Sequence, residues 1–393
     1  MENQIKSWHY IIILSMYLVS GSFFLFIQNA GLTILFTLII LILYIIRGYL
    51  KFKIKDGVGF LFFFVFYEII NYVLINNNHV SNGKETIIVC HIVFCIFSYF
   101  VITNFEFKKF RKIFLNISLF FAIIGIIAFA LALFNIVNPI VIGNIKLVLY
   151  QNLGWAVENT PRLAGIFWEP GAYQIVLMIA LIFYWQDIKL KQCTKSELIK
   201  LAVLCMALLA TQSSWGYFCF MYYIFTIIIK SNYNKNKIFS RLFVLGISIS
   251  FIYILTTSTV ITAKLAQSQL KNTETSYSVR LNDNIALATM IKEKPLFGYG
   301  IATKEFEMRS WSLDNKTSSN GILQLGATLG VLMMIVYIYY LYKSSKRMFP
   351  DNHKLIFPLF ILLNLMEVFY YFPLAYLLIF NFKNYKSINF TNK

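Results

Sequence analysis

The sequence predicts an all-α protein that crosses a membrane many times, and three observations support this fold class. Of the 393 residues, 59% are hydrophobic and only 13% are charged, whereas a soluble domain carries about 25% charged residues. Apolar runs of about 20 residues, long enough to cross a bilayer as a helix, recur from one end of the chain to the other. Lysine and arginine gather in short loops between these runs, as in the cytoplasmic loops of membrane proteins. We therefore expect residues 1–393 to form a single transmembrane domain.

The apolar runs define the expected helices in chain order. The last run is too long for one ordinary span and is broken at Phe372-Pro373, so we expect a short helical hairpin there. This predicts about twelve membrane-spanning helices, with about eleven as the alternative. The runs cover residues 8–27, 31–46, 57–75, 86–104, 113–135, 170–185, 197–211, 215–229, 242–257, 319–342 and 355–382.

The distribution of charge sets the expected topology. The formal net charge is +18, but its concentration in short loops points to the positive-inside bias of membrane proteins and away from nucleic-acid binding. Basic loops such as 47–55 and 343–354 face the cytoplasm on this rule, and the nearly neutral loops face outward. Two extracytoplasmic loops, 136–169 and 258–318, are far longer than a connection requires. Apolar residues at helical spacing predict a helical segment over Tyr277–Lys294 within the second loop.

The stretch PRLAGIFWEPGAY, Pro161–Tyr173, places two charged residues at the edge of an apolar run. Proline is well tolerated at the first position of a helix, and an acidic residue just before it complements the positive end of the helix dipole. Glu169 therefore has two interpretations, a simple helix cap and a functional carboxylate. Arg162 has two as well, an interfacial anchor and a binding residue.

Two further motifs follow in the chain. Residues 280–300, RLNDNIALATMIKEKPLFGYG, begin with Arg280 and end in a Pro-Leu-x-Gly-x-Gly sequence, and Asn320 then leads into a glycine-containing apolar run. Between the two arginine motifs, LLATQSSWGYF at 208–218 holds a Thr-x-Ser turn. In this order, the motifs resemble those of the O-antigen polymerase and O-antigen ligase family. The resemblance covers about residues 155–345 at the level of motifs and the whole chain in topology.

The resemblance implies a membrane glycosyltransferase of the C-type architecture. Members of the family take a glycan from undecaprenyl pyrophosphate on the outer face of the bacterial cytoplasmic membrane and pass it to a hydroxyl acceptor. Arg162 and Arg280 would then hold the pyrophosphate, because the planar guanidinium group binds phosphate oxygens in pairs, and we expect the two side chains to approach each other. Glu169 would accept the proton of the acceptor hydroxyl or orient an arginine. These three residues are the expected catalytic residues.

The same motifs supply the expected substrate-binding residues. Trp168 and Tyr173 are candidates for stacking on sugar rings, or for a place in the interfacial aromatic belt. Gly298 and Gly300 are candidates for a phosphate-binding nest, or for a plain turn after Pro295. The expected substrate-binding residues are Gly165, Trp168, Tyr173, Gly298, Gly300 and Asn320.

Histidine and carboxylate positions refine this expectation. Ligases of the family usually have His-Asn at the entry to the late helix, whereas this chain has Ser319-Asn320, which favours a polymerase over a ligase. The absence of an Asp-x-Asp pair or of a His/Cys cluster predicts chemistry without a metal, and we expect no cofactor. Glu68 and Glu367 lie inside apolar runs, where a carboxylate is costly. They are candidates for lining a cavity, for pairing with a basic residue, or for a neutral structural role.

The expected function is therefore the polymerisation of undecaprenyl-pyrophosphate-linked oligosaccharide repeat units, for O-antigen or capsular polysaccharide. A glycan ligase is the alternative within the family. A flippase for lipid-linked oligosaccharides is the alternative from another class, although its charges should line a cavity between helices, and the two arginines lie in outer loops. The expected partners are lipid-linked donor and acceptor oligosaccharides, membrane lipids and a chain-length regulator, with no nucleic acid.

Overall fold

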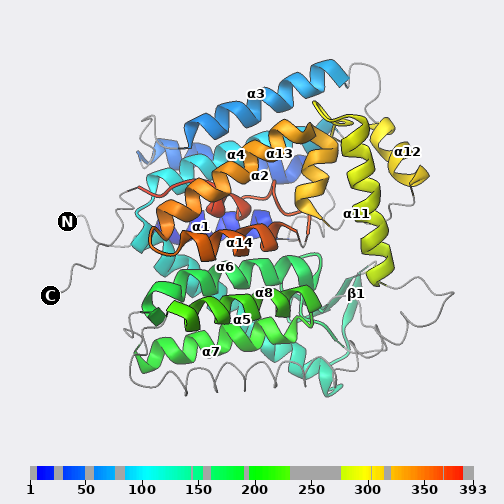
Figure 1. Cartoon of the computed structure of the whole chain (residues 1–393). Coiled ribbons are helices and arrows are strands. Elements are labelled where there is room, and N and C mark those ends of the chain that lie inside the picture. Colours follow the sequence, from blue (N-terminus) through cyan, green and yellow to red (C-terminus); the bar gives the residue numbers. More distant parts are fainter. Residues whose placement is uncertain are drawn as a thin grey trace. The chain divides into compact units, whose positions relative to one another are not determined.

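Helices form most of the regular structure of the chain, here a computed structural model (Figure 1). The structure describes residues 7–21, 30–48, 57–75, 85–142, 145–153, 161–189, 194–230, 276–301, 303–313, 320–365 and 367–383. The predicted apolar run 242–257 and residues 258–275, 302 and 314–318 of the second large loop lie outside these residues. The bounds of the helices are α1 Ser7–Ser20, α2 Ala30–Ile46, α3 Val58–Ile75, α4 Glu85–Asn104, α5 Phe107–Leu133, α6 Pro170–Lys189, α7 Lys195–Ala210, α8 Ser214–Lys230, α11 Ser276–Glu293, α12 Lys304–Ser312, α13 Gly321–Met348 and α14 His353–Asn364.

Hydropathy predicts these helices well, because each described apolar run before residue 350 contains one helix. Within the described residues, α3, α4, α5 and α13 are long and apolar enough to cross a membrane. Shorter apolar helices occupy Ser7–Ser20, Ala30–Ile46, Pro170–Tyr184 and His353–Asn364. The protein is thus a mostly helical membrane protein, and the expected number of spans stays a prediction.

The predicted helical hairpin at 355–382 is wrong in its second half. Helix α14 ends at Asn364, and the chain beyond it forms turns and one short 3-10 helix, η2, at Ala375–Leu378. Pro373 cannot donate a backbone hydrogen bond, but the backbone around it finds other partners. Ser98 donates to the carbonyl of Pro373 at 3.4 Å, and the amide of Leu374 donates to Ser20 at 2.8 Å. Irregular backbone is tolerated in a membrane protein where it is buried in protein, and the side chains of η2 are buried.

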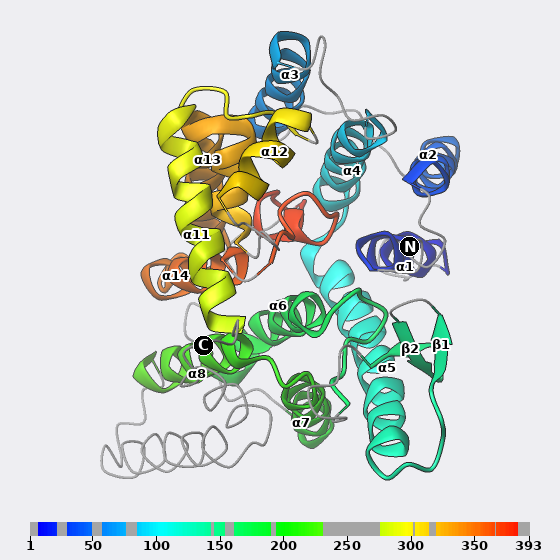
Figure 2. The same ribbon diagram turned by 90° about the vertical axis from the view of Figure 1, so that its right-hand side faces the viewer.

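The first large loop contains a small antiparallel sheet that the sequence reading did not predict. Its strands are β1 Ile140–Ile142, β2 Ile145–Val148 and β3 Gln151–Asn152, in the order β1-β2-β3; the first two are labelled in Figure 2. Leu149 and Tyr150 join β2 to β3 and have φ of 49° and 59°, which is the geometry of a two-residue type I′ turn. That turn usually carries Asn or Gly, so its sequence gives no signal here.

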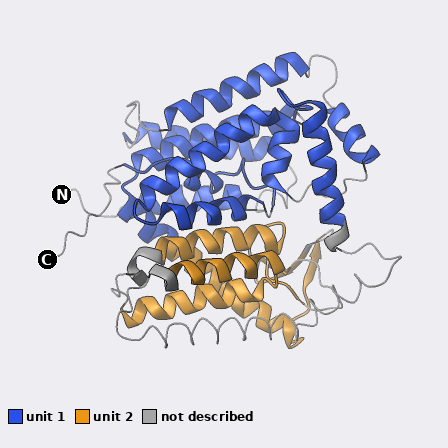
Figure 3. Cartoon of the chain, viewed as in Figure 1, with its two compact units in different colours: residues 1–114, 279–393 blue, residues 115–278 orange. Residues whose placement is uncertain are grey.

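By its contacts, the chain divides into two compact units (Figure 3). Unit 1 comprises residues 1–114 and 279–393, and unit 2 comprises residues 115–278. In unit 1, α13 packs against α14 and α3, and α4 packs against α2 and α3. In unit 2, α6 packs against both α7 and α8. Each unit therefore has its own helical core.

Helix α13 is kinked at Gly330, which has φ 85° and ψ 169°; Figure 1 shows its two halves running in different directions. The loop after α11 fills the kink. Tyr299 and Gly300 donate their amides to Ala327 and Thr328 at 2.9 Å each, and Val331 donates to Pro295 at 2.7 Å. These bonds satisfy the backbone groups that the kink frees, and they fix α11 relative to α13.

Helix α3 holds the same loop from the other side. The Tyr67 hydroxyl donates a hydrogen bond to the backbone carbonyl of Leu296. The side-chain amide of Asn71 donates one to the backbone carbonyl of Phe297 at 2.6 Å. The rings of Tyr67 and Phe297 also stack, with centroids 5.7 Å apart. The loop is therefore clamped between two helices of unit 1.

Candidate functional site

Arg280 lies near the beginning of α11, and its side chain contacts the carboxylate of Glu367, which follows α14 in the chain. Its Nη2 atom is 3.5 Å from Oε1 of Glu367, and its side chain is 44% exposed whereas that of Glu367 is 9% exposed. Asn284 lies one helical turn after Arg280 and thus on the same face. Its Oδ1 accepts a hydrogen bond from Nδ2 of Asn320 at 3.1 Å. One face of α11 therefore contacts both the start of α13 and the segment after α14.

Asn320 is the N-cap of α13. It has extended φ and ψ of −120° and 104°, and its Oδ1 accepts the amide of Leu323 at 3.1 Å, as a capping side chain does. A Cβ added to the next residue, Gly321, would lie 2.6 Å and 2.8 Å from the carbonyl oxygens of Glu367 and Asn364. Glycine is needed here because it lets the helix terminus approach the segment that carries Glu367.

The structure thus brings together two sequence-predicted residues, Arg280 and Asn320, with Glu367. Sequence reasoning noted Glu367 as a costly carboxylate but did not identify its partner, and it missed Asn284. The spacing of four residues from Arg280 on a predicted helix is the signal that would have found Asn284. We refer to Arg280, Asn284, Asn320 and Glu367 as the α13-entry cluster.

The electrostatics of the α13-entry cluster suit an anion with several oxygens. A helix N-terminus carries a partial positive charge and amide donors, and Arg280 adds a full charge with five N–H donors in a planar fork. Glu367 contacts only the Nη2 end of the Arg280 guanidinium group, and the Arg280 side chain is 44% exposed. The other N–H donors of this group can therefore reach a ligand. A phosphate or pyrophosphate group fits this donor set.

Arg162 lies in unit 2, in the segment that leads into α6. Its side-chain Nη2 donates a hydrogen bond to the backbone carbonyl of Gln212 at 3.2 Å, and its backbone amide donates one to the backbone carbonyl of Leu153 at 3.0 Å. Leu163 donates to the carbonyl of Ala210 at 2.9 Å. Gln212 belongs to the Thr-x-Ser turn, which joins α7 to α8 as predicted. Two motifs distant in sequence therefore meet at Arg162.

Glu169 immediately precedes α6, the position that its interpretation as a helix cap requires. Its carbonyl accepts the amide of Tyr173 at 3.3 Å, which begins the helical hydrogen bonding. Its carboxylate accepts a hydrogen bond from Nε1 of Trp168 at 3.0 Å. Trp168 and Glu169 are both partly exposed, so this carboxylate can be reached by a ligand.

The other expected binding residues near Glu169 have a clear packing role. Gly165 has φ 64°, and a Cβ there would lie 3.0 Å from the ring of Tyr173. Tyr173 is fully buried and stacks on Phe167, with centroids 5.6 Å apart. Its ring is enclosed by protein, so of the two predicted stacking residues only Trp168 is partly exposed, and its contact with a sugar stays a prediction.

Gly298 and Gly300 use their amides within the protein. Gly298 donates to Lys294 at 3.1 Å and Gly300 to Thr328 at 2.9 Å. Both have positive φ, 66° and 83°, and a Cβ at Gly298 would lie 2.6 Å from the Ala327 carbonyl. The structure thus describes a turn docked on α13, the plainer of the two interpretations, and the phosphate nest stays a prediction.

Three further expectations concern the approach of the two arginines, the partner of Glu68 and the use of a metal. Arg162 belongs to unit 2 and Arg280 to unit 1, and their expected approach stays a prediction. Glu68 pairs with a basic residue, since its Oε1 lies 3.0 Å from Nδ1 of His91. In the described part of the chain, no three His, Cys, Asp or Glu side chains gather as metal ligands would; metal-independent chemistry remains an expectation.

Comparison with known proteins identifies a family for part of the chain. Residues 199–338 match the family model described as O-antigen ligase, a range that includes the Thr-x-Ser turn, Arg280, Asn284 and Asn320. No curated protein matches the chain. The matched region extends from α7 through the first half of α13 and beyond its kink. For residues 199–338, this match confirms the family that the order of the motifs predicts.

Proposed function

We propose that the protein polymerises oligosaccharide repeat units carried on undecaprenyl pyrophosphate, on the outer face of the bacterial cytoplasmic membrane. The observation that carries this proposal is the α13-entry cluster, in which the partly exposed guanidinium group of Arg280 is held by Glu367, and Asn284 on the same helix is bonded to the N-cap of α13, within or next to the matched region. Donor and acceptor are both lipid-linked oligosaccharides, and the product serves as O-antigen or capsular polysaccharide. A chain-length regulator is the expected protein partner.

The reaction places definite demands on these residues. A hydroxyl oxygen of the acceptor glycan attacks the anomeric carbon of the donor, and the bond from that carbon to the pyrophosphate oxygen breaks. The leaving pyrophosphate takes the electron pair and gains charge, which Arg280 and Arg162 stabilise with positioned N–H donors. Loss of one such donor typically costs about 3–4 kcal/mol of transition-state stabilisation. The hydroxyl proton passes to a base, and Glu169 serves either as that base or in orienting an arginine.

Histidine positions favour a polymerase over a ligase. The residue before Asn320 is Ser319, where ligases of the family usually have histidine. Among the described residues, His91 of α4 is paired with Glu68 of α3, and His9 and His353 lie in α1 and at the start of α14. A histidine base at the entry to α13 is thus excluded by the sequence, which supports transfer between two carrier-linked glycans.

Purified protein in liposomes tests the proposal with three distinct products. Incubation with undecaprenyl-pyrophosphate-linked repeat units is expected to yield a ladder of longer carrier-linked chains. Transfer only to an added lipid A core would support the ligase. Movement of the labelled carrier across the bilayer without any new glycosidic bond would support the flippase.

A further inference from the structure

Glu367 carries a carboxylate into surroundings where it needs a partner. It is 7% exposed and lies in the apolar stretch after α14. A buried charge is costly unless it is paired and hydrogen-bonded, and the Arg280 guanidinium 3.5 Å away supplies opposite charge. The ion pair joins α11 to a segment far along the chain, in a part of unit 1 that the family match does not include.

The backbone that bears Glu367 is firmly held. Its carbonyl oxygen accepts the amide of Phe369 at 2.8 Å and lies against Gly321 at the start of α13. Close by in the chain, Tyr371 stacks on His91 with centroids 4.3 Å apart, and Tyr370 contacts Tyr337 edge-on at 6.3 Å. The carboxylate is therefore the fixed member of the pair, and the long, 44% exposed Arg280 side chain is the member that it orients.

The same geometry argues against Glu367 as the general base. In an in-line displacement, the acceptor hydroxyl approaches the anomeric carbon from the face opposite to the leaving group, as the attacking water does in inverting glycosidases. Arg280 contacts the leaving pyrophosphate in the proposed reaction, and Glu367 contacts Arg280. In this reaction Glu367 lies on the side of the leaving group, a position that suits orienting the arginine and not accepting the proton of the attacking hydroxyl.

We propose that Glu367 is a positioning residue that holds the Arg280 guanidinium group beside the N-terminus of α13, ready to bind the pyrophosphate of the lipid carrier. Asn284 and Asn320 complete this arrangement, because their hydrogen bond keeps α11 at the same helix terminus. The inference rests on the proposed function for the identity of the ligand, an undecaprenyl pyrophosphate. It extends the site to a residue outside the range that matches the family model.

A binding experiment on the purified full-length protein tests this role separately from polymerisation. The measured quantity is the Kd for undecaprenyl pyrophosphate in detergent. Glu367→Gln removes the charge and should weaken binding about tenfold, and Arg280→Lys, which loses the planar fork, should weaken it at least as much. The double variant should bind no more weakly than Arg280→Lys alone, since residues in one network do not act additively.

Conservative variants and a matched control complete the design. Glu367→Asp keeps the charge but shortens the side chain, so it should recover part of the affinity that Glu367→Gln loses. Glu106→Gln alters a carboxylate whose ion pair with Lys109, at 3.3 Å, is partly exposed; it should bind like the wild type, because such pairs contribute little. If Glu367→Gln fails to fold, the Asp variant decides, with a loss of about threefold expected from its shorter reach.

Two results would overturn the proposal. One is wild-type affinity in Glu367→Gln or, where that protein does not fold, in Glu367→Asp. The other is a double variant whose loss equals the product of the two single losses, which indicates independent effects. Failure of the proposed function gives a different pattern, in which the carrier binds and responds to these variants while no chain elongation occurs.

Discussion

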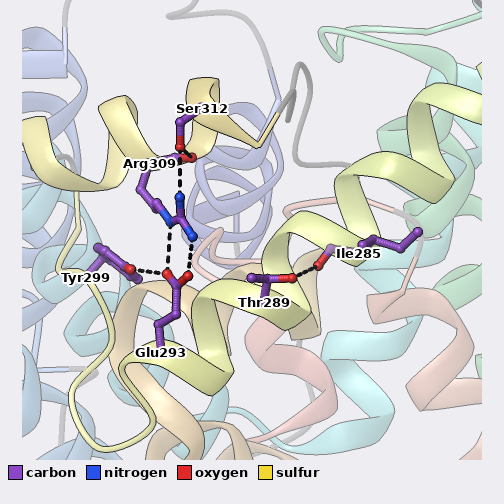
Figure 4. Close-up of polar contacts among 6 residues, drawn as sticks. All are labelled: Ile285, Thr289, Glu293, Tyr299, Arg309 and Ser312. Atoms are coloured by element: carbon purple, nitrogen blue, oxygen red, sulfur yellow. Dashed lines mark hydrogen bonds and ion pairs between the residues drawn. The ribbon is translucent and has the colours of Figure 1, made fainter.

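At the scale of single residues, Glu293 shows how α12 is attached to α11 (Figure 4). Its carboxylate accepts hydrogen bonds from the Tyr299 hydroxyl and from Nε of Arg309, the latter at 2.9 Å, and its second oxygen pairs with Nη2 of Arg309. Hydrogen bonds from Arg309 first, and then from Tyr299, lower the pKa of Glu293 from 4.5 to about 2. Burial first, and then the bond to Glu293, raises the pKa of Tyr299 to about 12.

These shifts predict how the attachment of α12 depends on pH. Because the pKa of folded Glu293 lies below its ordinary value, its contribution is fully present above about pH 4.5 and is lost as the pH falls toward about 2. Amide hydrogen exchange in Lys304–Ser312, corrected for its intrinsic pH dependence, should be slow and constant from pH 7 to about 5 and faster below. Glu293→Gln should give fast exchange already at pH 7, and equal protection in both proteins would contradict this role.

The sequence predicted single residues where a motif supplied the context. Arg280 and Asn320 were singled out from the order of motifs, and the structure places both in the α13-entry cluster. The partnership of Arg280 with Glu367 could not be predicted, since it joins distant positions through a non-helical segment. Hydropathy does not encode which buried carboxylate meets which cation, because that choice depends on tertiary packing.

At the scale of elements, the kink of α13 depends on one glycine. Gly330 has φ 85°, and a Cβ there would overlap the carbonyl oxygen of Leu296. Gly330→Ala should therefore destabilise the protein by about 2 kcal/mol or more, from backbone strain and the displaced loop. The matched control is Gly326→Ala in the same helix, where the nearest atom is the end of the Ile291 side chain at 2.8 Å, which can move.

Thermal unfolding in detergent, followed by tryptophan fluorescence, measures this difference. Gly330→Ala should lower Tm clearly more than Gly326→Ala. Equal Tm values for the two variants would mean that the kink does not depend on glycine at this position.

Hydropathy predicted where helices lie but not how they bend or what fills the loops. In the sequence, Gly330 is one more small residue in an apolar run, so the hydropathy pattern does not predict the kink. The sheet in loop 136–169 was missed because its strands have two to four residues each and its turn carries Leu149 and Tyr150 at positive φ. Such short elements are stabilised by tertiary contacts, among them the hydrogen bond from Asn152 to Gly165 at 2.6 Å.

At the scale of the whole molecule, the expected topology assigns both large loops to the outer face. Tyr150 lies in loop 136–169 and Trp311 in loop 258–318, and they are 88% and 77% exposed. Lys346 is an exposed residue of the basic segment 343–354. Tyr150→Cys and Trp311→Cys should react with an impermeant thiol reagent in spheroplasts. Lys346→Cys should react only after permeabilisation, as the positive-inside rule requires. Labelling of only one of the two loop variants would contradict a common outer face.

Charge and hydropathy predicted the whole-molecule class, because in lipid every backbone polar group needs a hydrogen-bond partner within the protein, which a long apolar helix supplies. They did not predict the irregular segment 367–383, which is mostly buried in protein and finds backbone hydrogen-bond partners there. Residues Leu374–Phe380 are buried, so apolar sequence there reflects the interior of unit 1 as much as it would a span.

The proposed function depends most on the planar guanidinium groups of Arg280 and Arg162, each of which we propose to bind carrier pyrophosphate during chain elongation. The most direct measurement is the glycan ladder made in liposomes by Arg280→Lys and Arg162→Lys, each reconstituted at the same amount as the wild type. Lysine keeps the charge but loses the fork, so each variant should elongate chains about 100-fold more slowly, in line with the loss of one positioned donor. Wild-type ladders from both variants would contradict the account and return the two arginines to the role of interfacial anchors.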